Sequence, residues 1–307
     1  MKIYAPSYYN RFCCIASACR HSCCRGWEID IDAASVERYR SMGGMLGKRL
    51  RSVIAYGKGE EQPHFILRDG DCCPFLNETG LCDLITELGE DALCQICRDH
   101  PRFRSFWSER AEIGLGLACE EAARIVLGWK DPVGLAVIGE DPEHPEMPSQ
   151  NERDLLELRE DLFAILQDRR IPIDERMQCF LRYCGLEEKL PHRSSAESME
   201  EFPDPQETVL PAGEDRLPAW AEISFEQFAV YLLFRNYADA LYDGRLEDRL
   251  LFIARGYYAV RRDWEKSDRS FESLVELARV FSNTYEYNIE TWGGFFSGEE
   301  EPSGTVG

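Results

Sequence analysis

Cysteine placement is the feature that most constrains this chain. The 307 residues include 13 cysteines, and 11 of them lie between Cys13 and Cys119. The opening residues, MKIYAPSYYN, hold no apolar stretch of the length that a secretory signal needs. We therefore expect a cytoplasmic protein, in which thiols stay reduced. Reduced thiols at this density favour metal ligation over disulfides.

The cysteines fall into spaced motifs. Cys94 and Cys97 form a Cys-x2-Cys pair, whose two sulfur atoms can reach one metal. Cys19 and Cys23 are four residues apart, so one helical turn would place both on one face. Where two cysteines are adjacent at 13–14 and 72–73, we rank the second above the first as a ligand. The candidate metal ligands are Cys14, Cys19, Cys23, Cys24, Cys73, Cys82, Cys94, Cys97 and Cys119.

The residue types leave the kind of metal open. All-sulfur ligation suits zinc and iron–sulfur clusters alike, and we favour an iron–sulfur centre with zinc as the alternative. Nine ligands exceed one four-ligand site, so they indicate two sites or one cluster with structural thiols beside it. His100 is a further possible ligand, whereas Cys179 and Cys184 fall in a helical pattern typical of core residues.

The charge balance restricts the partners of this protein. It has 56 acidic and 35 basic residues, a net charge of −21. Such a surface repels phosphate backbones and anionic lipids, so neither nucleic acid nor a membrane is expected as a partner. The charge suits a basic, lysine-bearing protein, although it also serves simply to keep a chain soluble.

Apolar periodicity predicts a mostly α fold, with a cysteine-rich, metal-organised N-terminal half and an α-helical C-terminal half. We expect a cysteine-rich domain at 1–130, a linker with four prolines at 131–150, a helical domain at 151–292 and a flexible tail at 293–307. A long exposed loop is expected at 190–219. The expected helices span 33–56, 120–129, 152–168, 173–183, 225–242, 246–262 and 271–290.

These motifs resemble the flagellin lysine-N-methylase family, part of a wider group of CxxCxxCC zinc- or iron-chelating domains. The resemblance covers about the first 130 residues. It rests on Phe12-x-Cys14, Cys19-x3-Cys23-Cys24-x-Gly26-Trp27, Cys73-Pro74-Phe75-Leu76 with Gly80-Leu81-Cys82, Cys94-x2-Cys97-x2-His100-Pro101-Arg102, and Cys119-Glu120-Glu121-Ala122-Ala123-Arg124.

The resemblance implies an activity and its cofactors. The family methylates lysine ε-amines of a protein, flagellin in the known cases, with S-adenosylmethionine as donor and a [4Fe–4S] cluster implicated. Towards the C-terminus the family has a Phe-Ser-Arg-x-x-Glu-His type segment. This chain carries Asn283 and Tyr287 in place of its Arg and His, but keeps Glu286.

Two common signatures of S-adenosylmethionine binding are not matched. The pair Gly114 and Gly116 begins like a Gly-rich nucleotide loop, but Cys119 stands at the third glycine position. We interpret the pair as a close-packed approach of the backbone to the cysteine segment. A radical enzyme's Cys-x3-Cys-x2-Cys run would need a cysteine where Gly26 stands.

Four further residues are candidates for the chemistry. A lysine acceptor must lose a proton, and Asp32 and Asp99 lie beside cysteine motifs as candidate bases, or else as helix caps and surface acids. Trp27 is a candidate for lining a cofactor or lysine pocket, or packs as a core aromatic. Arg102 is a candidate for holding an anionic cofactor group, or forms a salt bridge.

Two other classes of function fit the same residues. One is a non-enzymatic module, in which zinc or iron braces the fold and the acidic surface docks a basic protein. The other is a redox or metal-delivery protein. Measurements of metal content, colour and methyl transfer distinguish these two hypotheses from that of an enzyme.

Overall fold

The computed structural model describes residues 1–56, 62–141, 145–189 and 216–287. These residues divide into two compact units. The cysteine unit comprises Cys13–Arg102, and the main unit comprises Met1–Phe12 together with the chain from Phe103 onward. The expected boundary at residue 130 differs from this division. The reason is that the first strand and the segment after Phe103 belong to one sheet and one core.

The main unit contains a four-stranded sheet in the order β4-β5-β1-β6. Its strands are β1 (Lys2–Pro6), β4 (Arg102–Phe106), β5 (Arg110–Leu115) and β6 (Leu135–Glu140). Strand β1 pairs in parallel with β5, placing Ile3 opposite Ala111, and pairs antiparallel with β6. The expected linker at 131–150 therefore contains a sheet strand.

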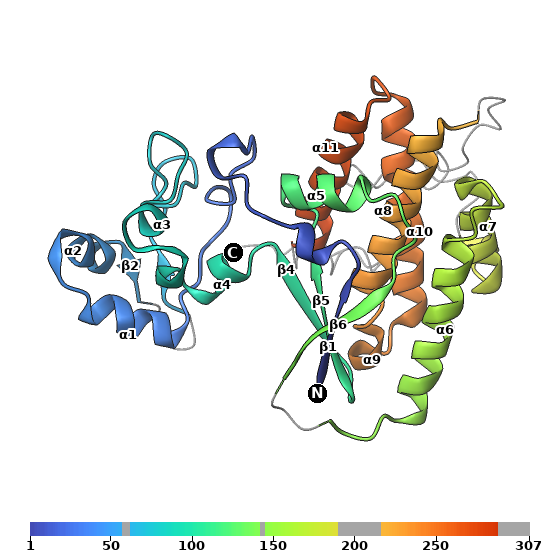
Figure 1. Cartoon of the computed structure of the whole chain (residues 1–307), viewed down its shortest axis with the longest axis horizontal. Coiled ribbons are helices and arrows are strands. Elements are labelled where there is room, and N and C mark those ends of the chain that lie inside the picture. Colours follow the sequence, from blue (N-terminus) through green and yellow to red (C-terminus); the bar gives the residue numbers. More distant parts are fainter. Residues whose placement is uncertain (57–61, 142–144, 190–215, 288–307) are drawn as a thin grey trace, which may run out of the picture. The chain divides into compact units, whose positions relative to one another are not determined.

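Helices form the rest of the main unit, which confirms the prediction of a helical C-terminal half. They pack as neighbouring pairs, with α8 against α5, α6, α7 and α10 (Figure 1). The helices are α5 (Glu120–Leu127), α6 (Gln150–Leu166), α7 (Ile173–Tyr183), α8 (Ala219–Asn236), α9 (Ala240–Asp243), α10 (Leu246–Glu265) and α11 (Phe271–Phe281), followed by a π-helical turn at Ser282–Glu286. Among the described residues, every helix is too short or too polar to cross a lipid bilayer.

Local sequence explains where these helices begin and end. Helix α7 starts after Pro172, whose fixed φ suits a helix entrance, and the chain leaves it at Gly185 with φ +68°. Helix α6 is capped by Ser149, whose hydroxyl accepts a hydrogen bond of 3.1 Å from the Glu152 N–H. Helix α8 is buried on nearly all sides because it lies at the centre of the core.

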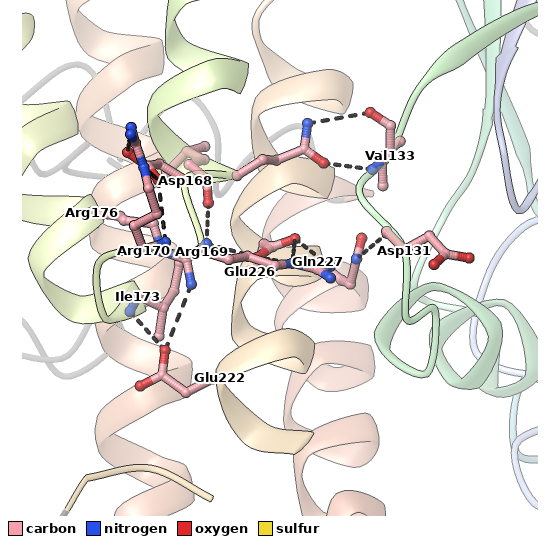
Figure 2. A network of polar contacts seen from close by, with 12 residues as sticks. Asp131, Val133, Asp168, Arg169, Arg170, Ile173, Arg176, Glu222, Glu226 and Gln227 are labelled. Carbon is pink, nitrogen blue, oxygen red and sulfur yellow. Dashed lines mark hydrogen bonds and ion pairs between the residues drawn. The ribbon is translucent and has the colours of Figure 1, made fainter. Parts of the chain in front are cut away.

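Ion pairs join the turn between α6 and α7 to α8. Figure 2 shows Arg169 and Arg176 converging on Glu226, whose carboxylate is fully buried. Arg169 donates from Nη2 at 2.8 Å, and Arg176 donates from Nη1 at 2.7 Å. Because a buried carboxylate is stable only when its charge is compensated, the two arginines and Glu226 form one structural group.

The cysteine unit consists of short helices and a two-stranded ribbon around a core of its own. Its elements are α1 (Ala33–Ser41), α2 (Gly44–Ser52), β2 (Ile54–Ala55), β3 (His64–Phe65), α3 (Asp83–Leu88) and α4 (Gln95–Asp99). The rings of Tyr39 and Phe75 pack on either side of Phe65, at centroid distances of 6.2 and 5.2 Å. The helix expected over 33–56 is two helices, because Gly44 has φ +73°, which ends α1 and starts α2 in a new direction.

Other expectations lie outside the described residues. These are the tail at 293–307 and the loop at 190–219, except for its last residues, where α8 begins at Ala219.

Candidate metal centre in the cysteine unit

Two cysteine segments meet through Cys24 and Cys73. The Cys73 N–H donates a hydrogen bond of 2.8 Å to the Cys24 carbonyl, and the neighbouring Gly26 N–H donates to the Asp71 carbonyl at 3.0 Å. The thiols of Cys23 and Cys73 donate hydrogen bonds to the Cys24 sulfur. The bond from Cys23 has the largest effect, followed by the bond from Cys73. Together they lower the pKa of Cys24 to about 3, although burial of this thiol acts to raise it. Both bonds favour the thiolate form of Cys24, which is the form that binds metal.

Cys94 and Cys97 form a second hydrogen-bonded thiol pair. The Cys97 thiol donates to the Cys94 sulfur, which lowers the pKa of Cys94 and raises that of Cys97. The charges of Cys24 and Cys73 also act on Cys97, and that of Cys24 acts on Cys82, so all five sulfur atoms lie close enough to interact. Cys94 starts α4, which positions Cys97 one turn further along.

The structure thus brings six of the nine expected ligands together. We call them the thiol cluster: Cys23, Cys24, Cys73, Cys82, Cys94 and Cys97. Within the described ranges, however, no three or more His, Cys, Asp or Glu side chains stand in an arrangement that could hold a metal ion. Five of these thiols are hydrogen-bonded to one another, Cys23 and Cys73 to Cys24 and Cys97 to Cys94. Metal organisation of this unit is therefore not a property that the structure shows.

Other expected ligands lie in different surroundings. Cys14 is exposed, and the Cys19 thiol donates a hydrogen bond of 3.1 Å to the His21 carbonyl. Cys119 belongs to the main unit, where it precedes α5 and packs against the main core. Cys72 accepts a hydrogen bond of 3.3 Å from Arg68.

His100 and Trp27 lie beside the thiol cluster. Their rings pack at a centroid distance of 6.1 Å, and the Trp27 indole donates a 2.6 Å hydrogen bond to the Cys23 carbonyl. Burial lowers the pKa of His100 to about 4, and Arg102 acts in the same direction, whereas Cys24 opposes it. A neutral imidazole retains a lone pair, which is the form that ligates metal. The effect of Arg102 on the pKa of His100 shows that these two side chains lie near each other.

The two candidate bases have structural partners. Asp32 caps α1 by accepting from the Ser35 N–H at 2.9 Å, and its other oxygen accepts from the Gln95 N–H at 2.8 Å. Burial opposes ionisation, but the hydrogen bonds from Gln95 and Ser35 lower the pKa of Asp32 overall. Asp99 ends α4 and accepts a 2.6 Å hydrogen bond from the Gln95 side chain.

Both glycines of the Gly-rich pair are in close-packed positions, but in the main unit. A Cβ at Gly114 would lie 2.3 Å from the Phe103 ring and 2.8 Å from that of Phe234. A Cβ at Gly116 would lie 2.1 Å from the Tyr287 hydroxyl. The close approach that we expected is present, and its partners are aromatic side chains rather than thiols.

A buried polar network around Glu286 was not predicted. Its carboxylate is fully buried and accepts hydrogen bonds from Tyr231 and Ser282, both at 2.5 Å, and from Asn236 at 3.0 Å. The only signal in the sequence was the position of Glu286 in the segment similar to the family's Phe-Ser-Arg-x-x-Glu-His. Nothing local marks Tyr231 or Asn236 as its partners.

The described residues form two units, and the smaller unit has a hydrophobic core of its own beside a group of interacting thiols. Comparison with known proteins identifies homologues. The chain is 30% identical over 138 residues to lysine-N-methylases of Salmonella typhimurium and Salmonella choleraesuis, and 29% identical over 137 residues to the flagellar biosynthetic protein FliU of Salmonella muenchen. These matches support a family relationship with the flagellin lysine-N-methylases.

The extent of the match is partial. The matches to the two lysine-N-methylases cover 43% of this chain and 34% of the length of each relative, and the match to FliU covers 42% of this chain and 79% of FliU. No family model matches the chain, and no solved structure is similar to it.

Proposed function

We propose that this protein is a protein-lysine N-methyltransferase that uses S-adenosylmethionine and a metal centre, an iron–sulfur cluster in preference to zinc. The observation that carries the proposal is the thiol cluster in a chain related to proteins named lysine-N-methylase. The substrate would be a protein with exposed lysines, flagellin by analogy with the relatives. The net charge of −21 suits such a basic acceptor.

In this proposal four thiols are the ligands, and metal binding would have to bring them into a common geometry, because the described side chains do not stand in an arrangement that could hold a metal ion. Cys24 and Cys73 form one hydrogen-bonded pair, Cys94 and Cys97 form the other, and the two pairs interact electrostatically. Soft thiolates are the preferred ligands of iron–sulfur clusters and of zinc, and binding releases the protons that the pairs now share. When bound, an iron–sulfur cluster supplies Lewis acidity and one-electron chemistry. Cys23, Cys82 and His100 would surround these four ligands.

The acceptor lysine needs a base. A free lysine has a pKa of about 10.4, so the ammonium must lose a proton before its nitrogen lone pair can form the new N–CH₃ bond. As that bond forms, the S–CH₃ bond of the donor breaks and its electron pair stays on sulfur. Asp32 holds two backbone N–H groups, which assigns it a structural role in this proposal, and Asp99 remains the candidate base of the cysteine unit.

Methyl transfer from a labelled donor tests the proposal. Protein purified without oxygen is incubated with flagellin and S-adenosylmethionine labelled in the methyl group, and flagellin is analysed for methyl-lysine by mass spectrometry. The proposal predicts label on lysine side chains, and loss of label in a Cys24→Ser, Cys73→Ser variant. A Cys13→Ser variant is the matched control, because Cys13 is exposed and lies outside the thiol cluster.

The outcome of this assay separates the candidate functions. Bound metal without any label on lysine would contradict an enzyme of this kind and leave a metal-binding or redox role.

A further inference from the structure

The main unit contains a cavity of about 390 Å³ next to the Glu286 network. This volume lies within the range of small-molecule sites, roughly 300–1,000 Å³. Strand β4 contributes Arg104 and Ser105 to its wall, and the end of α8 and the start of α10 contribute Arg235 and Arg249. The wall also contains the carboxylates of Asp239 and Glu286, so its three arginines exceed its acidic residues by one. This local positive charge stands out in a chain whose net charge is −21.

Arg235 is held rigidly at the wall of this cavity. Its guanidinium lies between the rings of Phe103 and Tyr287, 4.6 Å from each centroid. Its Nε atom forms an ion pair of 3.4 Å with Glu286. A guanidinium fixed between two rings loses little further freedom when it binds an anion, so Arg235 is pre-organised to bind one.

Glu286 serves to hold Arg235 rather than to meet a ligand. Its oxygen atoms already accept hydrogen bonds from Tyr231, Ser282 and Asn236. The carboxylate is placed there by the π-helical turn Ser282–Glu286, which follows the end of α11. Removing the Arg235–Glu286 ion pair from water costs free energy. The position of this pair beside the cavity indicates that the pair has a role in binding.

Asp239 provides the second charge that a ligand could meet. Its side chain is 55% exposed and lines the cavity, with Oδ2 bonded to Arg249 at 2.9 Å. A guanidinium and a carboxylate on one cavity wall complement a carboxylate and an ammonium carried on one carbon atom. An α-amino acid carries this pair of groups on its α-carbon.

We propose that this cavity binds the α-amino-acid group of the methyl donor, with its carboxylate at Arg235 and Arg104 and its ammonium at Asp239. This inference rests on the proposed function, because it presupposes S-adenosylmethionine as the donor.

Equilibrium binding tests the assignment without relying on turnover. The dissociation constants of S-adenosylmethionine and of methylthioadenosine, which lacks the amino-acid group, are measured by isothermal titration calorimetry for the anaerobically purified full chain. Arg235→Lys and Asp239→Asn should each weaken S-adenosylmethionine at least about tenfold and leave methylthioadenosine unchanged. Arg170→Gln is the matched control, because Arg170 is exposed and lies in the wall of a different cavity.

The possible failures are distinguishable. If the wild-type chain binds S-adenosylmethionine and both variants bind it equally well, the cavity assignment is wrong while the proposed function stands. If the wild-type chain binds none, both are wrong. Should Arg235→Lys fail to fold, Asp239→Asn decides alone, since its side chain is half-exposed and Arg249 keeps Asp243 at 2.5 Å as a partner.

Discussion

Cys73 is joined to Cys24 twice, through its backbone N–H at 2.8 Å and through its thiol, which donates to the Cys24 sulfur. The two residues are far apart in the sequence, so the fold itself brings their sulfur atoms together. This double link turns a cysteine-rich stretch into a defined thiol cluster. It also predicts which cysteines react with a probe and which are shielded.

Thiol alkylation should divide the cysteines by environment. In the folded protein, Cys13 and Cys14 are expected to react with iodoacetamide rapidly, because both are exposed. Cys73 and Cys94 should react at least about tenfold more slowly, because both are buried. Peptide mass spectrometry over a time course measures the rates. Equal rates at Cys14 and Cys73 would contradict the thiol cluster.

The Glu112–Arg159 pair should dominate the stability of the sheet in the main unit. Both side chains are fully buried, and Arg159 donates two hydrogen bonds of 2.7 Å to the Glu112 carboxylate, which also pairs with Arg110 at 3.0 Å. Glu112→Gln removes the only negative charge of this group and should cost about 3–5 kcal/mol at pH 7. Urea unfolding measures it, with Glu109→Gln, at an exposed acid, as the control.

The same pair predicts a pH dependence. Burial opposes ionisation of Glu112, but Arg159 and then Arg110 outweigh it and lower the pKa of Glu112. A carboxyl whose pKa is lower in the folded state contributes stability above its unfolded pKa of about 4.3, and that contribution is lost as the pH falls through the folded value. The difference in unfolding free energy between wild type and Glu112→Gln should therefore shrink below about pH 4. A difference that stays constant down to pH 2.5 would refute this interpretation.

Gly114 should not tolerate even one extra methyl group. A Cβ there would lie 2.3 Å from the Phe103 ring, which cannot move freely because Arg235 and Phe234 pack against it. Gly114→Ala is expected to destabilise the protein by about 1–3 kcal/mol, the usual cost of overpacking. Gly139→Ala in β6 is the control, since its nearest neighbour would lie at 3.9 Å. Similar melting temperatures for the two variants would argue against the packing described.

Removing the buried charge of Glu226 tests the group that joins α7 to α8. Glu226→Gln leaves Arg169 and Arg176 without their shared partner and should cost about 3–5 kcal/mol in thermal or urea unfolding. Arg170→Gln, which breaks the exposed pair with Asp168, should have no measurable effect. Comparable losses in both variants would show that burial does not set the strength of these pairs.

The helices of the main unit could be predicted from sequence because their signals are local. Helix α7 spans Ile173–Tyr183, the range expected from apolar spacing, with Pro172 before it. The sheet was missed because its signal is not local. Strand β1 is five residues long and pairs with β5 from Arg110, more than a hundred residues away, so no window of sequence contains both partners.

The candidate site likewise has features that could be predicted from the sequence and features that could not. Residue type and density predicted nine metal ligands, and this stays a prediction; the structure shows that six of these nine thiols interact with one another. Which thiols are hydrogen-bonded to each other depends on tertiary contacts such as the isolated β-bridge between Arg25 and Cys72, which no spacing rule specifies. The Arg235–Glu286 pair was invisible for the same reason, because it depends on α8 meeting the π-helical turn.

Metal analysis of the anaerobically purified chain, combined with its absorption spectrum, shows whether the thiol cluster holds a metal. An iron–sulfur centre at these thiols should give stoichiometric iron and a charge-transfer band at roughly 400 nm, both lost when Cys24 and Cys73 are changed to Ser and both retained when Cys72 is changed. A folded, colourless protein that carries neither iron nor zinc would contradict the proposed metal centre.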